Sequence, residues 1–345
     1  MNLKKLLVTL LQACVTLLLL WWIFHDPAKR AQMAQALSQA DPRWLIPCFL
    51  SFGLVLFCSS LRWRLLMRVQ GINLSLTRVW QLVMIGMFYN LFLPGGTGGD
   101  LVKIFYAVRE APRSKSAVFL SVVVDRITGM FALILVSTGV FLVFFNELTA
   151  LPMVRAFTLA VCVIFAATLA LVIVGLLVDR FHLAAKIPSR MPGHAAILDT
   201  ARAFSVYARD WRAVVAAVLL SLLLNLFIFG GAIFAASAFP GNPGPAAITS
   251  VIPVVNTISA LPISLAGIGV REKLFSSMLH SLYGTPEDLG VLISITGFAI
   301  IAAWGLLGGV VSLLYRAGAP SASLYEIEGE VGAIGERVEE EERAS

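Results

Sequence analysis

The sequence predicts an all-α polytopic membrane protein with six transmembrane helices and two re-entrant helical hairpins in an inverted repeat. Three observations support this fold class. Of the 345 residues, 59% are hydrophobic and only 13% are charged, a balance that no soluble core requires. Apolar runs long enough to cross a bilayer recur along the chain. Two further apolar runs are interrupted by proline and glycine.

Three spans are expected in the first half of the chain. They cover about Leu6–Phe24, Trp44–Leu61 and Ala117–Phe145. A short polar helix is expected within residues 25–43, and the arginine cluster that follows the second span suits anchoring at the membrane surface. Together with the first interrupted run, these elements form repeat one at about residues 1–150.

The first interrupted run breaks at Leu93-Pro94-Gly95-Gly96-Thr97-Gly98-Gly99. Its apolar part, Val79–Leu93, has 15 residues, or roughly 22 Å of helix, which falls short of a hydrocarbon core of roughly 30 Å. Glycines and proline do not propagate a helix, and broken backbone at membrane depth is tolerated only where protein or a water-filled cavity covers it. We therefore expect a re-entrant hairpin whose break is the functional site.

The second half, at about residues 151–316, repeats this order. Spans are expected at about Val154–Val178, Ala213–Phe239 and Leu289–Tyr315. An amphipathic interfacial helix is expected within the polar insertion 181–212. The second interrupted run, residues 246–283, breaks at Leu261–Gly269, and each half is too short to span comfortably.

Lysine and arginine predict the orientation of the chain. With the N-terminus inside, most basic residues fall on inner segments, and the outer loops hold Lys29, Arg30, Arg43 and Arg155. Both termini are then cytoplasmic, in a bacterial cytoplasmic membrane, and the two halves have opposite topology. Inverted repeats with broken helices that meet near the midplane are typical of secondary transporters.

The C-terminal segment 317–345 differs in composition from the transmembrane domain 1–316. It contains eight glutamates and two arginines, and we expect a disordered cytoplasmic tail. The four cysteines lie in apolar runs, so they predict neither a disulfide framework nor a metal site. The sequence also predicts no cofactor and no nucleic-acid partner.

Each returning half-helix of a hairpin points its N-terminus toward the membrane interior. Unpaired N–H groups and the helix dipole favour an anion there, and glycines let a ligand approach the backbone. Lys103 and Arg271 add positive charge, whereas Asp100 and Glu272 add negative charge. A phosphate or a zwitterionic phospholipid headgroup suits this mixture, although N-capping is an alternative role for Asp100.

Asp125 and Arg126 lie inside the third span, and charges at that depth are candidates for function. We expect Asp125 to pair with Lys103 or Arg271, and Arg126 to pair with Asp100 or Glu272. A purely structural salt-bridge network is the alternative. The candidate substrate-binding residues are Asn90, Pro94, Gly95, Gly96, Gly98, Gly99, Asp100, Lys103, Asp125, Arg126, Pro262, Gly267, Gly269, Arg271 and Glu272.

Three ordered motifs, Asn90–Lys103, Val124–Gly129 and Leu261–Glu272, resemble the flippase-like transmembrane family. That family includes the membrane half of lysylphosphatidylglycerol synthases and stand-alone bacterial and archaeal proteins. The resemblance covers about residues 5–315 and implies lipid translocation, with Asp100, Asp125, Arg126, Arg271 and Glu272 on motif positions. Because 29 residues follow Arg316, we expect no aminoacyl-transferase domain and do not expect synthase activity.

The leading hypothesis is therefore a translocase that moves a phospholipid, or another lipid with a phosphate-bearing headgroup, between leaflets. Its expected partners are anionic or zwitterionic membrane lipids. One alternative is an integral membrane enzyme that modifies lipids, with Asp100, Asp125 and Glu272 as its acids and bases. Another is a scaffold for a separately encoded lipid-modifying enzyme, which would dock on the acidic tail.

Overall fold

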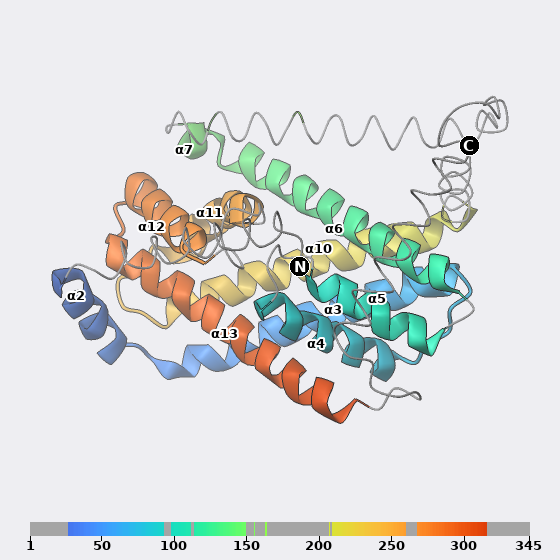
Figure 1. The fold of residues 1–345 in the computed structure, drawn as a ribbon. Coiled ribbons are helices and arrows are strands. Elements are labelled where there is room, and N and C mark those ends of the chain that lie inside the picture. The colour runs from blue at the N-terminus through green and yellow to red at the C-terminus, as the bar shows by residue number, and fades with distance from the viewer. Residues whose placement is uncertain are drawn as a thin grey trace, which may run out of the picture.

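The structure is a computed structural model that describes residues 27–92, 98–111, 114–149, 209–259 and 268–315, with residues 155, 163 and 207. In these ranges every regular element is helical (Figure 1). The elements are α2 (Pro27–Ser38), the 3-10 helix η1 (Pro42–Trp44), α3 (Leu45–Val69), α4 (Leu76–Phe92), α5 (Gly98–Glu110), α6 (Lys115–Val143), α7 (Phe145–Thr149), α10 (Trp211–Ser237), α11 (Gly244–Ser259), α12 (Val270–Tyr283) and α13 (Glu287–Leu314).

Four stretches of helix are long and apolar enough to cross a membrane. They cover Pro42–Val69, Ala117–Val143, Trp211–Ser237 and Glu287–Leu314, with 27 or 28 residues each. They confirm four of the expected spans, and α2 confirms the short helix expected within residues 25–43. The spans expected at Leu6–Phe24 and Val154–Val178, most of the insertion 181–212 and the tail 317–345 lie outside the described residues.

The helices α3 and α10 run antiparallel along most of their length. Near one end the Cys48 thiol donates to the Gly231 carbonyl at 3.2 Å, and near the other the Tyr207 hydroxyl donates to the Leu66 carbonyl at 3.2 Å. The helix α6 packs beside both, and α13 crosses the bundle obliquely (Figure 1). The interior between these helices is mostly apolar, with buried polar side chains such as Arg62, Asp125 and Asn225.

Between the long helices lie two pairs of shorter helices, α4 with α5 and α11 with α12. Their lengths of 17, 13, 16 and 14 residues are below the ~20 residues that a span needs. In the first pair, Arg78 near the start of α4 lies 3.9 Å from Glu110 at the end of α5. In the second, the Ser250 and Tyr283 hydroxyls are 2.8 Å apart. Each pair therefore folds back on itself, with both outer ends on the same side.

Both pairs pack against α13, but they approach it from opposite ends. The glycines Gly305 and Gly308 face Leu91 and Met84 of α4 so closely that an added Cβ would lie 2.3 Å from a Leu91 methyl carbon and 2.1 Å from the Met84 carbonyl oxygen. Near the other end of α13, an added Cβ on Gly290 would lie 2.7 Å from Cα of Ser276 on α12. The end of α4 and the start of α12 therefore both point toward the middle of α13.

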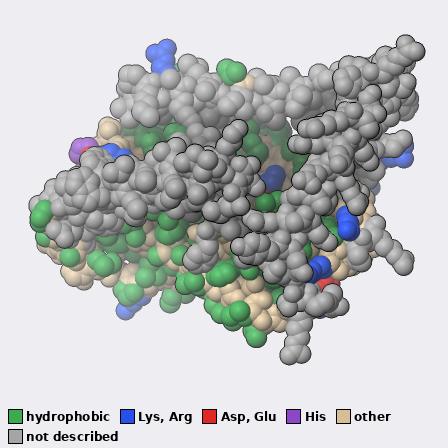
Figure 2. Space-filling view, in the orientation of Figure 1, with side chains coloured by type: hydrophobic (Ala, Val, Ile, Leu, Met, Phe, Trp, Pro, Cys, Tyr) green, Lys and Arg blue, Asp and Glu red, His purple; other side chains and the backbone are tan. Residues whose placement is uncertain are grey.

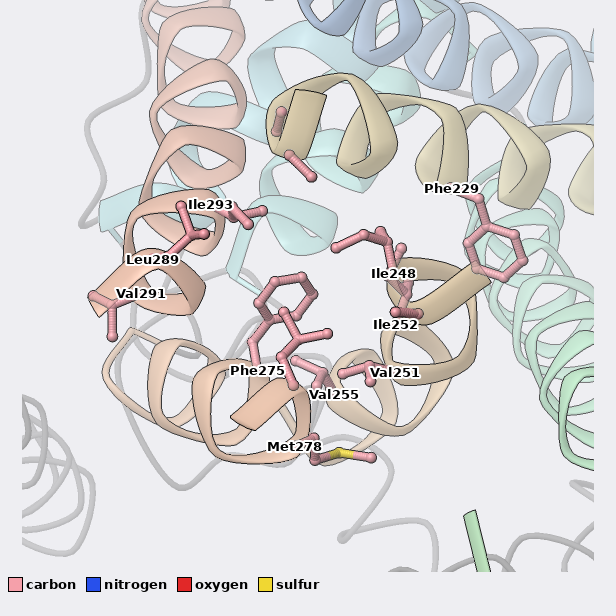
Figure 3. Packing of buried hydrophobic residues seen from close by; sticks show 14 of the residues in the cluster. Phe229, Ile248, Val251, Ile252, Val255, Phe275, Met278, Leu289, Val291 and Ile293 are labelled. Atoms are coloured by element: carbon pink, nitrogen blue, oxygen red, sulfur yellow. The ribbon is translucent and has the colours of Figure 1, made fainter. Parts of the chain in front are cut away.

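Two apolar clusters hold these pairs in place. One joins α11 and α12 to α10 and α13, and in Figure 3 the side chains of these helices point toward one another. The other joins α4 and α5 to α3 and α6. The labelled members of the first cluster are Phe229, Ile248, Val251, Ile252, Val255, Phe275, Met278, Leu289, Val291 and Ile293.

Candidate functional site

A buried carboxylate on α6, Asp125, is the centre of the candidate site. Its Oδ1 accepts a hydrogen bond of 2.7 Å from Nε of Arg62 on α3, and its Oδ2 lies 3.6 Å from Nζ of Lys103 on α5. All three side chains are less than a tenth exposed. Charges at such depth are costly unless they are paired, and Asp125 is the shared counterion of both cations.

One helical step away, Arg126 points to a different partner. Its guanidinium donates to the Asp100 carboxylate near the start of α5, and the arginine is about half exposed. The expected pairs of Asp125 with Lys103 and of Arg126 with Asp100 are thus confirmed. Two consecutive residues of α6 therefore attach this long helix to α5 through two separate ion pairs.

The close packing of α4 on α5 places Lys103 in this cluster. A Cβ on Gly99 would lie 2.0 Å from the Gly86 carbonyl oxygen, so only glycine permits this approach. The Gly99 N–H donates to the Asn90 side-chain carbonyl at 2.8 Å, which joins the facing ends of the two helices. The Lys103 ammonium then lies over the Trp63 ring, 4.0 Å from its centroid, in a cation–π contact.

Arg62 is the site residue that the sequence interpretation missed, because it was assigned to anchoring at the end of the second span. The helix α3 in fact continues to Val69, so Arg62 lies about two turns inside it. Besides Asp125, its guanidinium donates to the Ser221 hydroxyl of α10 at 2.8 Å. The sequence does carry a signal for this burial, because apolar residues continue the helical pattern after Arg62, and two of them, Trp63 and Leu66, are fully buried.

At the start of α12, Glu272 acts as a helix cap. Its Oε2 accepts from the Gly269 N–H at 2.6 Å, and Ser294 of α13 donates to its Oε1 at 3.4 Å. Gly269 has a φ of 83°, a conformation that favours glycine. The expected alternative that Glu272 pairs with Arg126 is therefore wrong, because Arg126 contacts Asp100.

A cavity of about 530 Å³ lies between the pair α11–α12 and the long helices α3, α6, α10 and α13, and Met87 of α4 also lines it. Its described wall is mostly apolar; the charged residues in that part are Arg62 and Arg271, and the polar ones include Asn225, Asn256 and Ser294. This volume is within the usual range of roughly 300–1,000 Å³ for ligand sites. Figure 2 shows hydrophobic side chains over much of the described surface on this face, with isolated basic side chains among them.

The comparisons with known proteins identify the chain's relatives. The family model described as the lysylphosphatidylglycerol synthase TM region matches residues 6–309. The chain belongs to this family. A UPF0104 membrane protein of Pyrococcus horikoshii is 31% identical over 126 residues, which is 36% of this chain and 36% of that relative. The match thus spans just over a third of the relative's length, and no solved structure matches the chain.

In this member of the lysylphosphatidylglycerol synthase TM region family, the structure brings together only part of the predicted site. Asn90, Gly99, Asp100, Lys103, Asp125 and Arg126 form one connected group, to which Gly98 is adjacent and buried. Gly269, Arg271 and Glu272 form a second group at the start of α12. The expected residues Pro94, Gly95, Gly96, Pro262 and Gly267 lie outside the described residues.

Proposed function

We propose that this protein is a lipid translocase that moves a lipid with a phosphate-bearing headgroup between the leaflets of a bacterial cytoplasmic membrane. The observation that carries the proposal is the convergence of two short helix pairs on the middle of α13, beside a cavity that is lined by two arginines. Membership of the lysylphosphatidylglycerol synthase TM region family supports a membrane setting for this arrangement.

In the proposed topology, each pair is a re-entrant hairpin and the two enter from opposite membrane faces. Each helix of a pair is too short to span alone, and each pair has its outer ends together, which supports this arrangement. Basic residues such as Arg64, Arg68 and Arg109 lie at the bundle end that holds the outer ends of α4 and α5, which favours a cytoplasmic location for that end.

The cavity would receive the headgroup while the acyl chains remain in the hydrocarbon. A headgroup that crosses the bilayer without a protein loses its hydration, which costs free energy. Hydrogen-bond donors of the protein in the middle of the membrane replace part of that hydration. Alternating access of a central site between two inverted repeats is the general mechanism of such folds. The ion pairs of Asp125 and Arg126 would hold α5 against α6 in the conformation described here.

Reconstitution tests this proposal. Purified protein in liposomes should move a fluorescent phospholipid from the inner to the outer leaflet, as measured by dithionite quenching. Neutralisation in Arg126→Gln or Arg271→Gln should slow that movement. Arg43→Gln is the control and should not slow it, because Arg43 is exposed and lies at the opposite end of the bundle from Arg68. Failure of the wild-type protein to move any tested phospholipid would contradict the proposal.

The alternative of a lipid-modifying enzyme receives less support from the geometry. Its three candidate acids and bases already have other partners: Asp100 and Asp125 are in ion pairs and Glu272 caps α12. Total lipid extracts of a deletion strain separate the two functions. Loss of an enzyme removes a lipid species, whereas loss of a translocase changes only its distribution between leaflets.

A further inference from the structure

We infer that the cavity selects lipids whose headgroup carries net negative charge and rejects lipids whose headgroup is cationic, such as aminoacylated phosphatidylglycerol. This inference rests on the proposed translocase function and narrows its substrate class. The observation behind it is that, among the described residues, arginines line the cavity and carboxylates do not.

Two charged side chains line the cavity among the described residues, and both are arginines. Arg62 reaches it from α3, and Arg271 reaches it from the first turn of α12, where its guanidinium lies 5.6 Å from the centroid of the Phe298 ring. The two arginines come from different halves of the chain. Each half of the chain therefore contributes one arginine to the cavity wall.

No described carboxylate is among the residues that line the cavity. Asp125 is engaged by Arg62 and Lys103, and neither it nor Glu272 is a lining residue. The two carboxylate oxygens of Glu272 accept hydrogen bonds from the Gly269 N–H and the Ser294 hydroxyl. Among the described residues, the charged groups of the cavity wall are thus two cations, Arg62 and Arg271, and no carboxylate.

The remaining polar groups of the wall suit an oxygen-rich headgroup. Asn225 and Asn256 supply amides, and the Ser259 hydroxyl is buried without a hydrogen-bond partner among the described residues. A buried hydroxyl in that state points to a ligand or solvent group beside it. Phosphate and glycerol oxygens are the acceptors and donors that such groups bind.

The low dielectric of the membrane interior makes this charge asymmetry selective. Coulomb interactions weaken less there than in water, so a cationic headgroup near two guanidinium groups is strongly disfavoured. A zwitterionic headgroup loses part of the attraction of its phosphate because its amine lies beside the same arginines. The order of movement should therefore be anionic, then zwitterionic, then cationic.

The test compares three lipids that carry the same fluorescent acyl chain in proteoliposomes of the full-length protein. They are phosphatidylglycerol, phosphatidylethanolamine and lysylphosphatidylglycerol, and dithionite quenching gives the initial rate for each. We expect phosphatidylglycerol to move at least about tenfold faster than the lysylated lipid, because like charges at an interface cost several kcal/mol. A parallel assay measures uptake of radiolabelled inorganic phosphate, which should not occur.

Substitutions that make the cavity wall more negative should shift the preference toward the lysylated lipid. Arg271→Glu should lower the phosphatidylglycerol rate and raise the ratio of lysylated lipid to phosphatidylglycerol. Asn256→Asp adds one carboxylate with little change of shape and should raise the same ratio. This second variant keeps the test possible if Arg271→Glu does not fold. The matched control is Arg109→Gln, on the outer part of α5 against Phe105, which should leave the ratio unchanged.

The outcomes separate this inference from the function on which it rests. If no lipid moves, the translocase proposal itself fails. If lipids move but the lysylated lipid is as fast as phosphatidylglycerol, or if Asn256→Asp leaves the ratio unchanged, the charge selectivity is wrong and the translocase proposal stands. Uptake of inorganic phosphate without lipid movement would make the cavity a site for the free anion and overturn both.

Discussion

Asp125 and Arg62 are 63 residues apart in the chain, yet the carboxylate of one accepts a 2.7 Å hydrogen bond from the guanidinium of the other inside the helix bundle. Lys103 shares the same carboxylate, so one anion serves two buried cations on two different helices. The stability of the bundle should therefore be unusually sensitive to this single side chain.

Substitution of Asp125 by asparagine should destabilise the fold. It leaves Arg62 and Lys103 buried without their common counterion, and breaking a buried pair in this way costs roughly 3–5 kcal/mol of unfolding free energy. Thermal unfolding in detergent, followed by tryptophan fluorescence, measures the loss. The same change at Asp288, in the first turn of α13, is the control and should have little effect. Equal melting of wild type and Asp125→Asn would show that the cluster does not stabilise the bundle.

A methyl group at Gly308 should separate α4 from α13. The added Cβ would meet the Met84 carbonyl oxygen at 2.1 Å, and a backbone atom has little freedom to move. Gly308→Ala should lower the unfolding free energy by about 1–3 kcal/mol through this overpacking. Gly139→Ala on α6 is the matched control, since no atom of the described residues lies within 4 Å of its added Cβ. A Gly308→Ala protein as stable as Gly139→Ala would disprove the close packing.

Removal of the cap at Glu272 should loosen the start of α12. Glu272→Ala leaves the Gly269 N–H without its acceptor, and loss of a cap costs about 0.5–2 kcal/mol. Glu272→Gln keeps a carbonyl oxygen in place and should cost less. Hydrogen exchange at residues 269–274 reports the difference directly. Faster exchange in Glu272→Gln than in Glu272→Ala would be inconsistent with a capping role.

Single cysteines should reveal which side of the membrane each helix pair enters from. In a protein without its native cysteines, Asn73→Cys and Lys115→Cys flank α4–α5, and Pro240→Cys and Ser281→Cys mark the outer ends of α11–α12; all four native residues are exposed. We expect a membrane-impermeant maleimide to label the first two only from the cytoplasm and the last two only from outside.

The decisive comparison is within each pair of cysteines. If Asn73→Cys and Lys115→Cys were labelled from opposite sides, α4 and α5 would together cross the membrane, and the re-entrant topology would be wrong. Thr149→Cys, at the end of α7, provides an independent reference for the side that α6 reaches.

Local sequence signals sufficed for the helices and for part of the site. Hydropathy located α6, α10 and α13 to within about two residues, because an apolar run of that length has few alternatives. Charges inside an apolar run identified Asp125 and Arg126, and the glycines before Lys103 placed that residue on a returning helix.

Contacts between distant helices were harder to predict. Arg62 belongs to a cluster of three arginines, a pattern that usually marks a membrane surface, and only its position against α6 and α10 reveals its burial. Glu272 was ambiguous for a similar reason. A carboxylate three residues after a glycine fits both a helix cap and an ion pair, and the three-dimensional contact decides for the cap.

The two glycine contacts at opposite ends of α13 have a mechanical consequence. With backbone pressed against backbone at Gly308 and again at Gly290, α13 cannot tilt or slide without displacing α4 and α12 together. Opening on one membrane face and closing on the other would then be a single concerted event, and a crosslink that immobilises α13 would arrest both halves at once.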